Sequence, residues 1–429
     1  MEAFFYRLII NMKLILYNLV LISFLISGSR VDTIIINGNK RTKNHIIRRE
    51  LLHEMHSPLD SLVLKEDINR LYNLNIFSKV DINVIDNTYY VDVVESFSII
   101  PDLVIDYSEI SKKWSYGLGI ADMNFLGLNQ TLYIGGAFIG DKWIALSLDN
   151  PWVFGDHISF STTIFSRNSD NPFYYFNYDE KYFLLETGFY KGLSNKFKFG
   201  LSYHETNKNK STFSDDFYYF LNSKPLDYRY FNILFDYRYD TRDLYKDPLK
   251  GVLFGLDLSY SKGLISDNYD ITRIGVSLEQ FFLLEDNHWE DLVLSYQIAG
   301  FFKYPKFSRL PFYEYIYLGG EEYVRGYSSH YDELPPNFNK IIEASNIIYN
   351  HIELQSTILE RKNYGKIEFG IDRVLFINSG IGSTYFNDFS LDNFLIGYGF
   401  GFKFFTIGPP ISLMVGFNPF GQYHIHLGT

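Results

Sequence analysis

Residues 396–404 read Ile-Gly-Tyr-Gly-Phe-Gly-Phe-Lys-Phe, a strict alternation of large apolar side chains with glycine or lysine. Because successive side chains of a β-strand point to opposite faces, the segment presents one apolar face and one small or polar face. In transmembrane β-barrels one such face meets lipid and the other meets an aqueous lumen. The stretch therefore predicts a strand of a transmembrane barrel.

The same period of two recurs from about Ser98 to the C-terminus. Residues 197–203 alternate Phe, Leu and Tyr with Lys, Gly and Ser, and residues 231–239 alternate aromatic and aliphatic side chains with polar ones. At about ten residues per membrane strand plus turns, this length predicts roughly 16 antiparallel strands. A soluble β-sandwich is the alternative, and we disfavour it because such aromatic rows would aggregate in water.

Composition agrees with a membrane barrel. Aromatic residues are 19% of the chain, with 36 Tyr and 40 Phe, as expected for girdles at both bilayer interfaces. The net charge of −11 argues against a nucleic-acid partner. Cysteine is absent, which excludes disulfides and cysteine-ligated metals.

The N-terminus carries a targeting signal. After Met12 and Lys13, residues 14–26 are almost wholly apolar and end in Ser27, Gly28 and Ser29. This pattern predicts a signal peptide over residues 1–29, with residues 1–11 as a possible upstream start-site artefact. An uncleaved anchor is the alternative, but the apolar run is shorter than the ~20 residues of a spanning helix.

Residues 30–97 have a different pattern, which predicts a small α+β domain in the order strand, helix, helix, strand, strand. Ile34 and Ile36 alternate in the first strand, and apolar positions at helical spacing follow at 47–55 and 64–71. Asp86, Asn87 and Thr88 turn the last two strands into a hairpin. About 70 residues can bury one modest core.

This domain resembles a POTRA domain, the periplasmic module of BamA-like assembly factors. The resemblance rests on the element order and on two segments, Ile36 to Asn39 and Leu74 to Val80. It implies that unfolded clients bind by adding a strand to an exposed sheet edge. Any other small α+β domain remains the alternative.

The barrel region resembles the BamA/TamA-like outer-membrane assembly factor superfamily. Its inward-folded loop has a Gly-Gly pair followed by an Arg-Gly-aromatic triplet, and the corresponding residues here are Gly319, Gly320, Val324, Arg325, Gly326 and Tyr327. A mid-barrel strand and turn of the family is matched by Asp240, Arg242, Asp243, Pro248 and Gly251. The resemblance implies one POTRA domain at residues 30–97 followed by an outer-membrane barrel at 98–429.

A guanidinium inside a barrel needs an anionic partner, because it stays charged at every accessible pH. Strand parity offers Glu353 and Asp372, and we expect Arg325 to contact at least one of them. We also expect Gly397, Gly399 and Gly401 to lie near the seam between the first and last barrel strands.

The resemblance implies a function in inserting or translocating other proteins at a bacterial outer membrane, with the POTRA domain in the periplasm. The expected partners are outer-membrane lipid, unfolded outer-membrane or secreted proteins as clients, and accessory lipoproteins. Two alternatives remain open. One is a secretion pore dedicated to a single exported partner, and the other is a passive porin or structural surface protein.

Enzyme chemistry is not expected, and neither is a cofactor or a metal. His53-Glu54-Met55-His56 resembles a zinc motif, but its histidines are three residues apart, and Ser57 stands where H-E-x-x-H has its second histidine. We interpret this segment as a solvated helix end. His424 and His426 share one face of the last strand and have no third ligand nearby in sequence.

Overall fold

The computed structural model describes residues 30–108, 113–153, 157–170, 177–208, 227–264, 270–287, 290–305, 310, 314–328, 334, 338–386, 388–406 and 410–428. The signal peptide predicted for residues 1–29 lies outside this part of the chain. Within the described residues, every helix is too short or too polar to cross a membrane.

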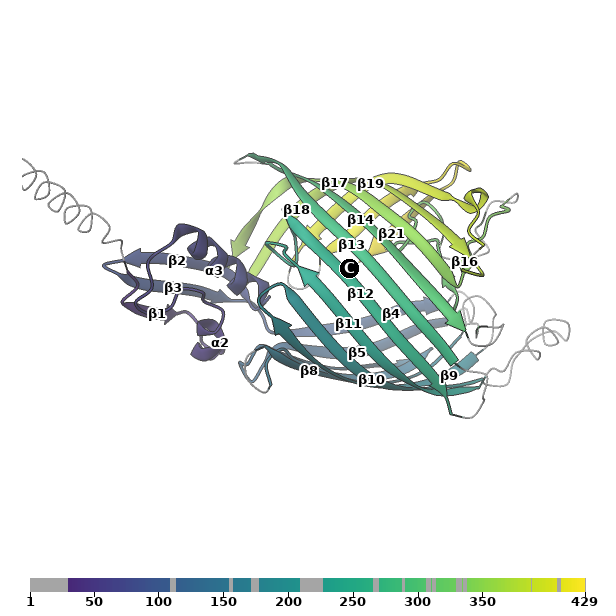
Figure 1. The fold of residues 1–429 in the computed structure, drawn as a ribbon, viewed down its shortest axis with the longest axis horizontal. Helices are drawn as coiled ribbons and strands as arrows, with labels where there is room; N and C mark the ends of the chain where they lie inside the picture. The colour runs from purple at the N-terminus through teal and green to yellow at the C-terminus, as the bar shows by residue number, and fades with distance from the viewer. Residues whose placement is uncertain are drawn as a thin grey trace, which may run out of the picture.

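The N-terminal part is a three-stranded sheet with two helices on it (Figure 1). Its elements are β1 (Thr33–Asn37), α2 (Asn44–Arg48), α3 (Ser61–Asn73), β2 (Phe77–Ile85) and β3 (Thr88–Glu95). The strand order is β1-β3-β2, with β1 parallel and β2 antiparallel to the central β3. This is the element order that the sequence predicts.

The helices bury their apolar faces against this sheet. Ile47 from α2 and Leu71 from α3 are fully buried, as are Tyr89 and Val91 on β3. The start of α3 is fixed by Asp60, whose carboxylate accepts the backbone N–H of Leu62 at 2.8 Å. The domain therefore has its own core.

The rest of the chain forms one 16-stranded antiparallel sheet that curls into a barrel (Figure 1), which confirms the predicted fold class. Its strands are β4 (Ile99–Ser108), β5 (Lys113–Phe125), β6 (Gln130–Ile139), β7 (Lys142–Asn150), β8 (Ile158–Asp170), β9 (Asn177–Lys191), β10 (Asn195–Lys208), β11 (Tyr228–Asp240), β12 (Gly251–Gly263), β13 (Asp270–Asn287), β14 (Glu290–Pro305), β17 (Asn346–Tyr364), β18 (Ile367–Ser383), β19 (Leu395–Phe405), β20 (Ile411–Phe417) and β21 (Tyr423–Gly428). Neighbours in sequence are neighbours in the sheet, and β14 pairs with β17 across a long loop. The first strand, β4, and the last, β21, stand at the two ends of the pairing order.

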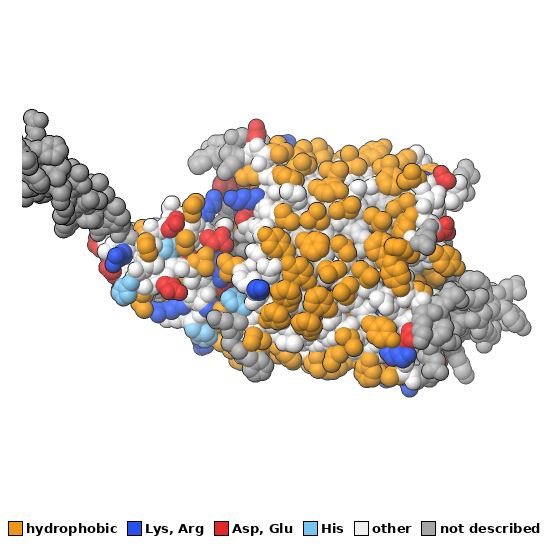
Figure 2. All heavy atoms as spheres, viewed as in Figure 1, with side chains coloured by type: hydrophobic (Ala, Val, Ile, Leu, Met, Phe, Trp, Pro, Cys, Tyr) orange, Lys and Arg blue, Asp and Glu red, His pale blue; other side chains and the backbone are white. Residues whose placement is uncertain are grey.

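Alternation along the strands gives the barrel an apolar outer face. Leu201 and Ile233 are 61% and 62% exposed, whereas their sequence neighbours Ser202 and Asn232 are buried. Figure 2 shows the resulting band of hydrophobic side chains on the visible face of the barrel wall. The outer face thus suits lipid, and the inner face carries the polar groups.

The loop between β14 and β17 folds into the barrel and packs on its inner wall. It contains a short pair of strands, β15 (Ile316–Tyr317) and β16 (Glu343–Ala344). Leu318 and Val324 from this loop are fully buried against Ile347 of β17 and Leu395 of β19. This apolar contact fixes the position of the segment around Arg325.

Candidate functional site

The segment Leu318–Tyr327 forms a tight loop closed by its own backbone. The N–H of Val324 donates to the carbonyl of Leu318, and the N–H of Gly320 donates to that of Tyr327, both at 3.0 Å. Gly320 and Gly326 have φ values of +99° and +102°, which side-chain-bearing residues rarely adopt. The two glycines of the motif therefore shape the loop that presents Arg325.

Arg325 is 3% exposed and has three partners on the barrel wall. Its Nη2 lies 2.5 Å from Oε1 of Glu353 on β17, and its Nε donates to Oδ1 of Asn378 on β18 at 2.8 Å. The guanidinium also lies over the ring of Phe376, 3.9 Å from the ring centre. The expected contact with Glu353 is thus present in the structure.

Glu353 joins Arg325 to a second cation. Lys403 of β19 donates to Oε2 of Glu353 at 2.8 Å and to Oε1 of Gln355 at 3.2 Å. One carboxylate therefore holds two positive groups that reach it from the loop and from β19. Such a buried network keeps its geometry only while each charge retains a partner.

Asp372 needs a correction, because its carboxylate accepts a hydrogen bond from Gln355 at 2.7 Å and is not a partner of Arg325. Glu353 pairs across the sheet with Phe376, four residues along β18 from Asp372. Four residues of strand correspond to about 13 Å, so the two acids lie at different depths in the barrel. Parity predicted the correct face for Asp372 and could not predict its depth.

The wall under the loop is made of glycines that leave room for its backbone. A Cβ on Gly397 of β19 would lie 1.6 Å from the carbonyl oxygen of Arg325, and one on Gly416 of β20 would lie 2.4 Å from the nitrogen of Gly326. Both positions therefore require glycine, since backbone cannot yield as a flexible side chain can.

The predicted seam position of the β19 glycines also needs correction. β19 pairs with both β18 and β20, so two further strands of the C-terminal hairpin separate it from the end of the sheet. Gly399 and Gly401 face the lumen, where a Cβ on them would meet Phe376 and Met414. Their smallness serves packing inside the barrel rather than an open edge.

The loop is tied to the last two strands. The N–H of Gly326 donates to Nε2 of His426 on β21 at 2.9 Å, and its carbonyl accepts from Nδ2 of Asn418 at 2.7 Å. Glu321 accepts from the hydroxyl of Ser412 on β20 at 2.8 Å. These bonds brace the C-terminal hairpin from inside the barrel.

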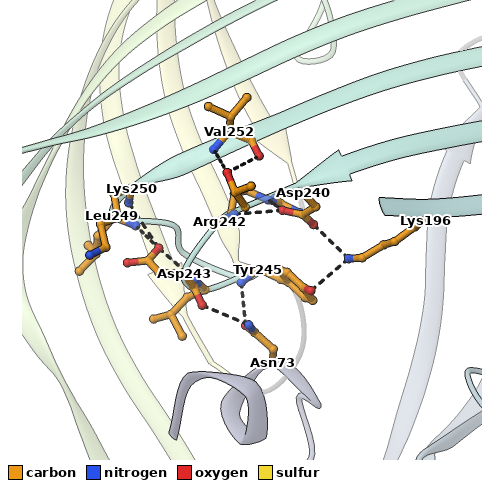
Figure 3. Close-up of polar contacts among 11 residues, drawn as sticks. Asn73, Lys196, Asp240, Arg242, Asp243, Tyr245, Leu249, Lys250 and Val252 are labelled. Carbon is orange, nitrogen blue, oxygen red and sulfur yellow. Dashed lines mark hydrogen bonds and ion pairs between the residues drawn. The ribbon is translucent and has the colours of Figure 1, made fainter. Parts of the chain in front are cut away.

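The mid-barrel motif builds the turn between β11 and β12 (Figure 3). The carboxylate of Asp240 accepts from Nε of Arg242 at 3.0 Å and from Lys196 at 3.2 Å. Asp243 accepts three backbone N–H groups within the turn, from Leu244, Leu249 and Lys250. The motif residues therefore hold one turn rigid.

The two remaining motif residues are Pro248, within this turn, and Gly251, the first residue of β12. Gly251 has a φ of +115°, and a Cβ there would lie 2.4 Å from the carbonyl oxygen of Thr241. Pro248 borders a lumenal cavity of about 330 Å³ that Glu353 and Lys403 also line. The turn and the pair of Glu353 and Lys403 thus line one cavity.

Asn73, the last residue of α3, hydrogen-bonds to this turn through both the nitrogen and the oxygen of its side-chain amide (Figure 3). Its Nδ2 donates to the carbonyl of Asp243 at 3.1 Å, and its Oδ1 accepts the N–H of Tyr245 at 2.9 Å. The small domain is thereby fastened to a barrel turn through backbone groups. Burial lowers the pKa of Lys246 in the same turn.

Sequence reasoning missed the residues that complete both sites. Lys403 carried a signal, since it is the one charge on the lumenal face of residues 396–404. Asn378 and Asn73 carried none, because their partners are distant in sequence. His426 was noted for its face of the last strand, but its partner, the backbone N–H of Gly326, could not be predicted.

His53 also differs from its interpretation as part of a solvated helix end. It is 3% exposed, its Nδ1 lies 2.8 Å from Oδ2 of Asp67, and its Nε2 accepts the N–H of Asp60 at 3.2 Å. Tyr89 donates to the same carboxylate at 2.8 Å, and burial followed by this hydrogen bond raises the pKa of Tyr89. These residues form a polar network inside the core of the small domain.

Two family models match the chain. The Omp85 superfamily domain matches residues 124–424, and the POTRA model, described as surface antigen variable number repeat, matches residues 29–96. The chain belongs to the Omp85 superfamily. Omp85 barrels of this kind lie in the outer membrane, with their POTRA domains in the periplasm.

Solved structures with the same fold include BamA from Haemophilus ducreyi lacking POTRA domains 1–3, with a TM-score of 0.55 and 17% identity over 93% of this chain and 83% of that one. CdiB from Escherichia coli has a TM-score of 0.57 and 14% identity over 94% and 75%. CdiB from Acinetobacter baumannii has 0.52 and 14% over 92% and 71%. A comparison with curated protein sequences gave no match.

Proposed function

We propose that this Omp85 protein is an assembly factor that inserts barrel proteins into the outer membrane. Membership of the superfamily supports a role in protein insertion or translocation at that membrane. The observation that carries the narrower proposal is the bracing of the C-terminal hairpin by the arginine loop. It gives β21 a rigid support from inside while its outer edge stands at the end of the sheet.

In this proposal β4 and β21, which do not pair with each other among the described residues, stay apart while the edge of β21 pairs with the first strand of a client. A strand edge presents unpaired N–H and C=O groups and so is a template for another strand. The bonds from Gly326 to His426 and Asn418 keep β21 in register while its outer edge pairs with the client strand. No nucleotide is required, because client folding supplies the free energy.

In the same proposal the POTRA domain binds the client by strand addition at a sheet edge. Its sheet has two edge strands, β1 of five residues and β2 of nine. The longer edge of β2 offers more backbone pairs to an extended segment. We therefore expect photo-crosslinkers at exposed Asn83 on β2 to capture client, and those at Ile35 on β1 to capture little.

The proposal is tested by reconstituting the protein into liposomes and adding an unfolded barrel client. Client folding above the rate in empty liposomes, read from protease protection, is the expected result. Depletion in cells separates the alternatives: general loss of outer-membrane barrels supports assembly. Loss of one exported protein would instead favour a dedicated secretion pore, and loss of neither would favour a porin.

A further inference from the structure

One segment of the POTRA domain has the opposite charge from the chain as a whole. Residues 40–49 read Lys-Arg-Thr-Lys-Asn-His-Ile-Ile-Arg-Arg, with five cations and no acid, in a protein of net charge −11. Lys40, Lys43, His45 and Arg48 are exposed. Among the described residues, no carboxylate lies within ion-pair distance of Lys40, Lys43 or Arg48. Figure 2 shows Lys, Arg and His side chains on this domain beside the edge of the hydrophobic band.

The barrel residue that anchors this segment lies on the outer, lipid-facing side. In the pairing of β4 with β5, Asp122 is opposite Ile99, and Leu118 is opposite Leu103. Directly opposed residues share a face of the sheet, and residues two apart on a strand do too. Ile99, Leu103 and Leu118 are 52%, 70% and 63% exposed, so Asp122 belongs to the row of outward apolar side chains.

Arg41 reaches this outward row. Its Nη2 forms an ion pair with Asp122, and its Nη1 donates to Oγ of Ser98 at 2.6 Å. The next turn of the barrel holds the following residues, since the N–H of Lys43 donates to the carbonyl of Gly127 at 3.0 Å. Leu126, at the tip of that turn, is 61% exposed. The basic segment is therefore fastened where the apolar band ends, which is the depth of the lipid headgroups.

The acids near this segment already have partners. Glu95 accepts the backbone N–H groups of Arg41 and Thr42, and Glu50 is paired with Arg70 and Arg49. The remaining lysines thus keep their positive charge unopposed at the membrane edge. Each Lys or Arg near an anionic bilayer contributes about 1 kcal/mol of attraction, which is about fivefold in binding.

We propose that residues 40–49 form a binding surface for anionic phospholipid headgroups in the leaflet that faces the periplasm. Lys40 and Lys43 contact the phosphates, while Arg41 fastens the segment to the outer face of β5. The surface lies beside β4, the first strand of the barrel, and so gathers anionic lipid next to one end of the sheet. It depends on the outer-membrane location and not on the proposed insertion activity.

The test uses the full-length protein in nanodiscs of phosphatidylcholine, alone or with phosphatidylglycerol, and measures amide hydrogen exchange of residues 40–48. We expect phosphatidylglycerol to slow exchange there, and 1 M salt to remove the effect because it shortens the screening length to ~3 Å. The double variant Lys40→Gln/Lys43→Gln should lose the effect, about 25-fold in binding constant for two lysines.

The matched control removes two other POTRA lysines, as Lys65→Gln/Lys79→Gln, and should keep the response to phosphatidylglycerol. Slow exchange of the β3 amides reports that each variant is folded. Equal exchange in both lipid mixtures, or loss of the response in the control variant, would overturn the proposal. Protection by added poly-glutamate without protection by phosphatidylglycerol would also overturn it, because the surface would then bind acidic polypeptide.

Discussion

At the scale of single residues, the site depends on one carboxylate between two cations. Glu353 accepts from both Arg325 and Lys403, so the loss of Glu353 leaves buried Arg325 beside the half-buried Lys403, whereas the loss of Arg325 leaves a complete pair. Removal of Glu353 and removal of Arg325 should therefore lower the stability of the barrel by different amounts. The carboxylate is the more costly residue to remove.

We predict that Glu353→Gln destabilises the barrel by about 3–5 kcal/mol, the range for an uncompensated buried charge. Arg325→Met should cost less, about 1–3 kcal/mol, because Lys403 still neutralises Glu353. Urea unfolding in micelles, followed by tryptophan fluorescence, measures both. A larger loss of unfolding free energy for Arg325→Met than for Glu353→Gln would refute the claim that Glu353 is the shared partner of both cations.

The glycine wall predicts a second effect at this scale. Gly416→Ala should push the loop off β20, because the new Cβ would lie 2.4 Å from the nitrogen of Gly326. We expect faster hydrogen exchange of the Gly326 amide, which otherwise donates to His426.

Gly200→Ala is the control, since its Cβ would meet only flexible atoms of Glu186 and Leu234 at 3.1–3.2 Å. If the Gly326 amide exchanges equally slowly in both variants, then Gly416 is not needed for the close approach of the loop to β20.

The residues of these sites were predictable to different degrees. Arg325 and Glu353 follow from the motif and from strand parity, which assigns a side chain to the lumen without knowledge of any partner. Asp372 shows the limit of that reasoning, because parity repeats every two residues and does not report depth. The glycines of β19 show another limit, since smallness alone does not distinguish a packing site from a sheet edge.

At the scale of elements, the POTRA domain and the β11–β12 turn meet through the amide of Asn73. Both bonds go to backbone groups, so the contact depends on the fold of the turn rather than on its side chains. Asp243 maintains that fold through its three backbone bonds.

We predict that Asn73→Ala exposes the Tyr245 amide and speeds its hydrogen exchange. The amides of Leu249 and Lys250 should keep their protection, since they donate to Asp243 within the turn. Glu66→Ala, at an exposed position of the same helix, is the matched control. Unchanged exchange at Tyr245 would mean that Asn73 does not hold the two parts together.

Inside the POTRA domain, the polar network on Asp67 predicts a stability effect. Asp67 is fully buried and accepts from Leu52, His53 and Tyr89. Asp67→Asn loses acceptor capacity and should destabilise the domain by about 1–3 kcal/mol.

Exchange of the β3 amides in the full chain measures this change. The control is Asp81→Asn, at a half-exposed position whose carboxylate pairs with exposed Lys79, and it should change stability by less than about 0.5 kcal/mol. Equal stability of the two variants would show that the network contributes nothing.

The elements themselves were largely predictable. Alternation with a period of two identifies the strands, and apolar positions at helical spacing identify α3. The first helix was only partly predicted: its apolar positions were placed at 47–55, whereas α2 ends at Arg48 and Met55 is exposed. The hydrogen bonds of Asn73 to the turn were not predictable, since they join residues about 170 positions apart and their partners are main-chain atoms.

At the scale of the whole molecule, the polar contacts run from the POTRA domain to the last barrel strand. Asn73 binds the turn before Asp247, and Asp247 accepts from Gln355 at 2.8 Å. Gln355 contacts Lys403, and Lys403 contacts Glu353, the partner of Arg325. The loop at the end of this series braces β21 and thus supports the strand that the proposed function requires to pair with a client.

The strand number and barrel topology were also within reach of the sequence, since length and strand period limit them together. The series of polar contacts from Asn73 to the arginine loop could not be predicted from the sequence. It depends on which lumenal side chains lie at the same depth in the barrel.

The separation of β4 from β21 is the central claim, and a reversible cross-link tests it most directly. The chain has no cysteine, so cysteine pairs introduced along β4 and β21 form the only disulfides. With the protein in liposomes and an unfolded barrel client added, we expect the oxidised protein to lose client insertion and the reduced protein to regain it. Full insertion by the oxidised, cross-linked protein would contradict the account.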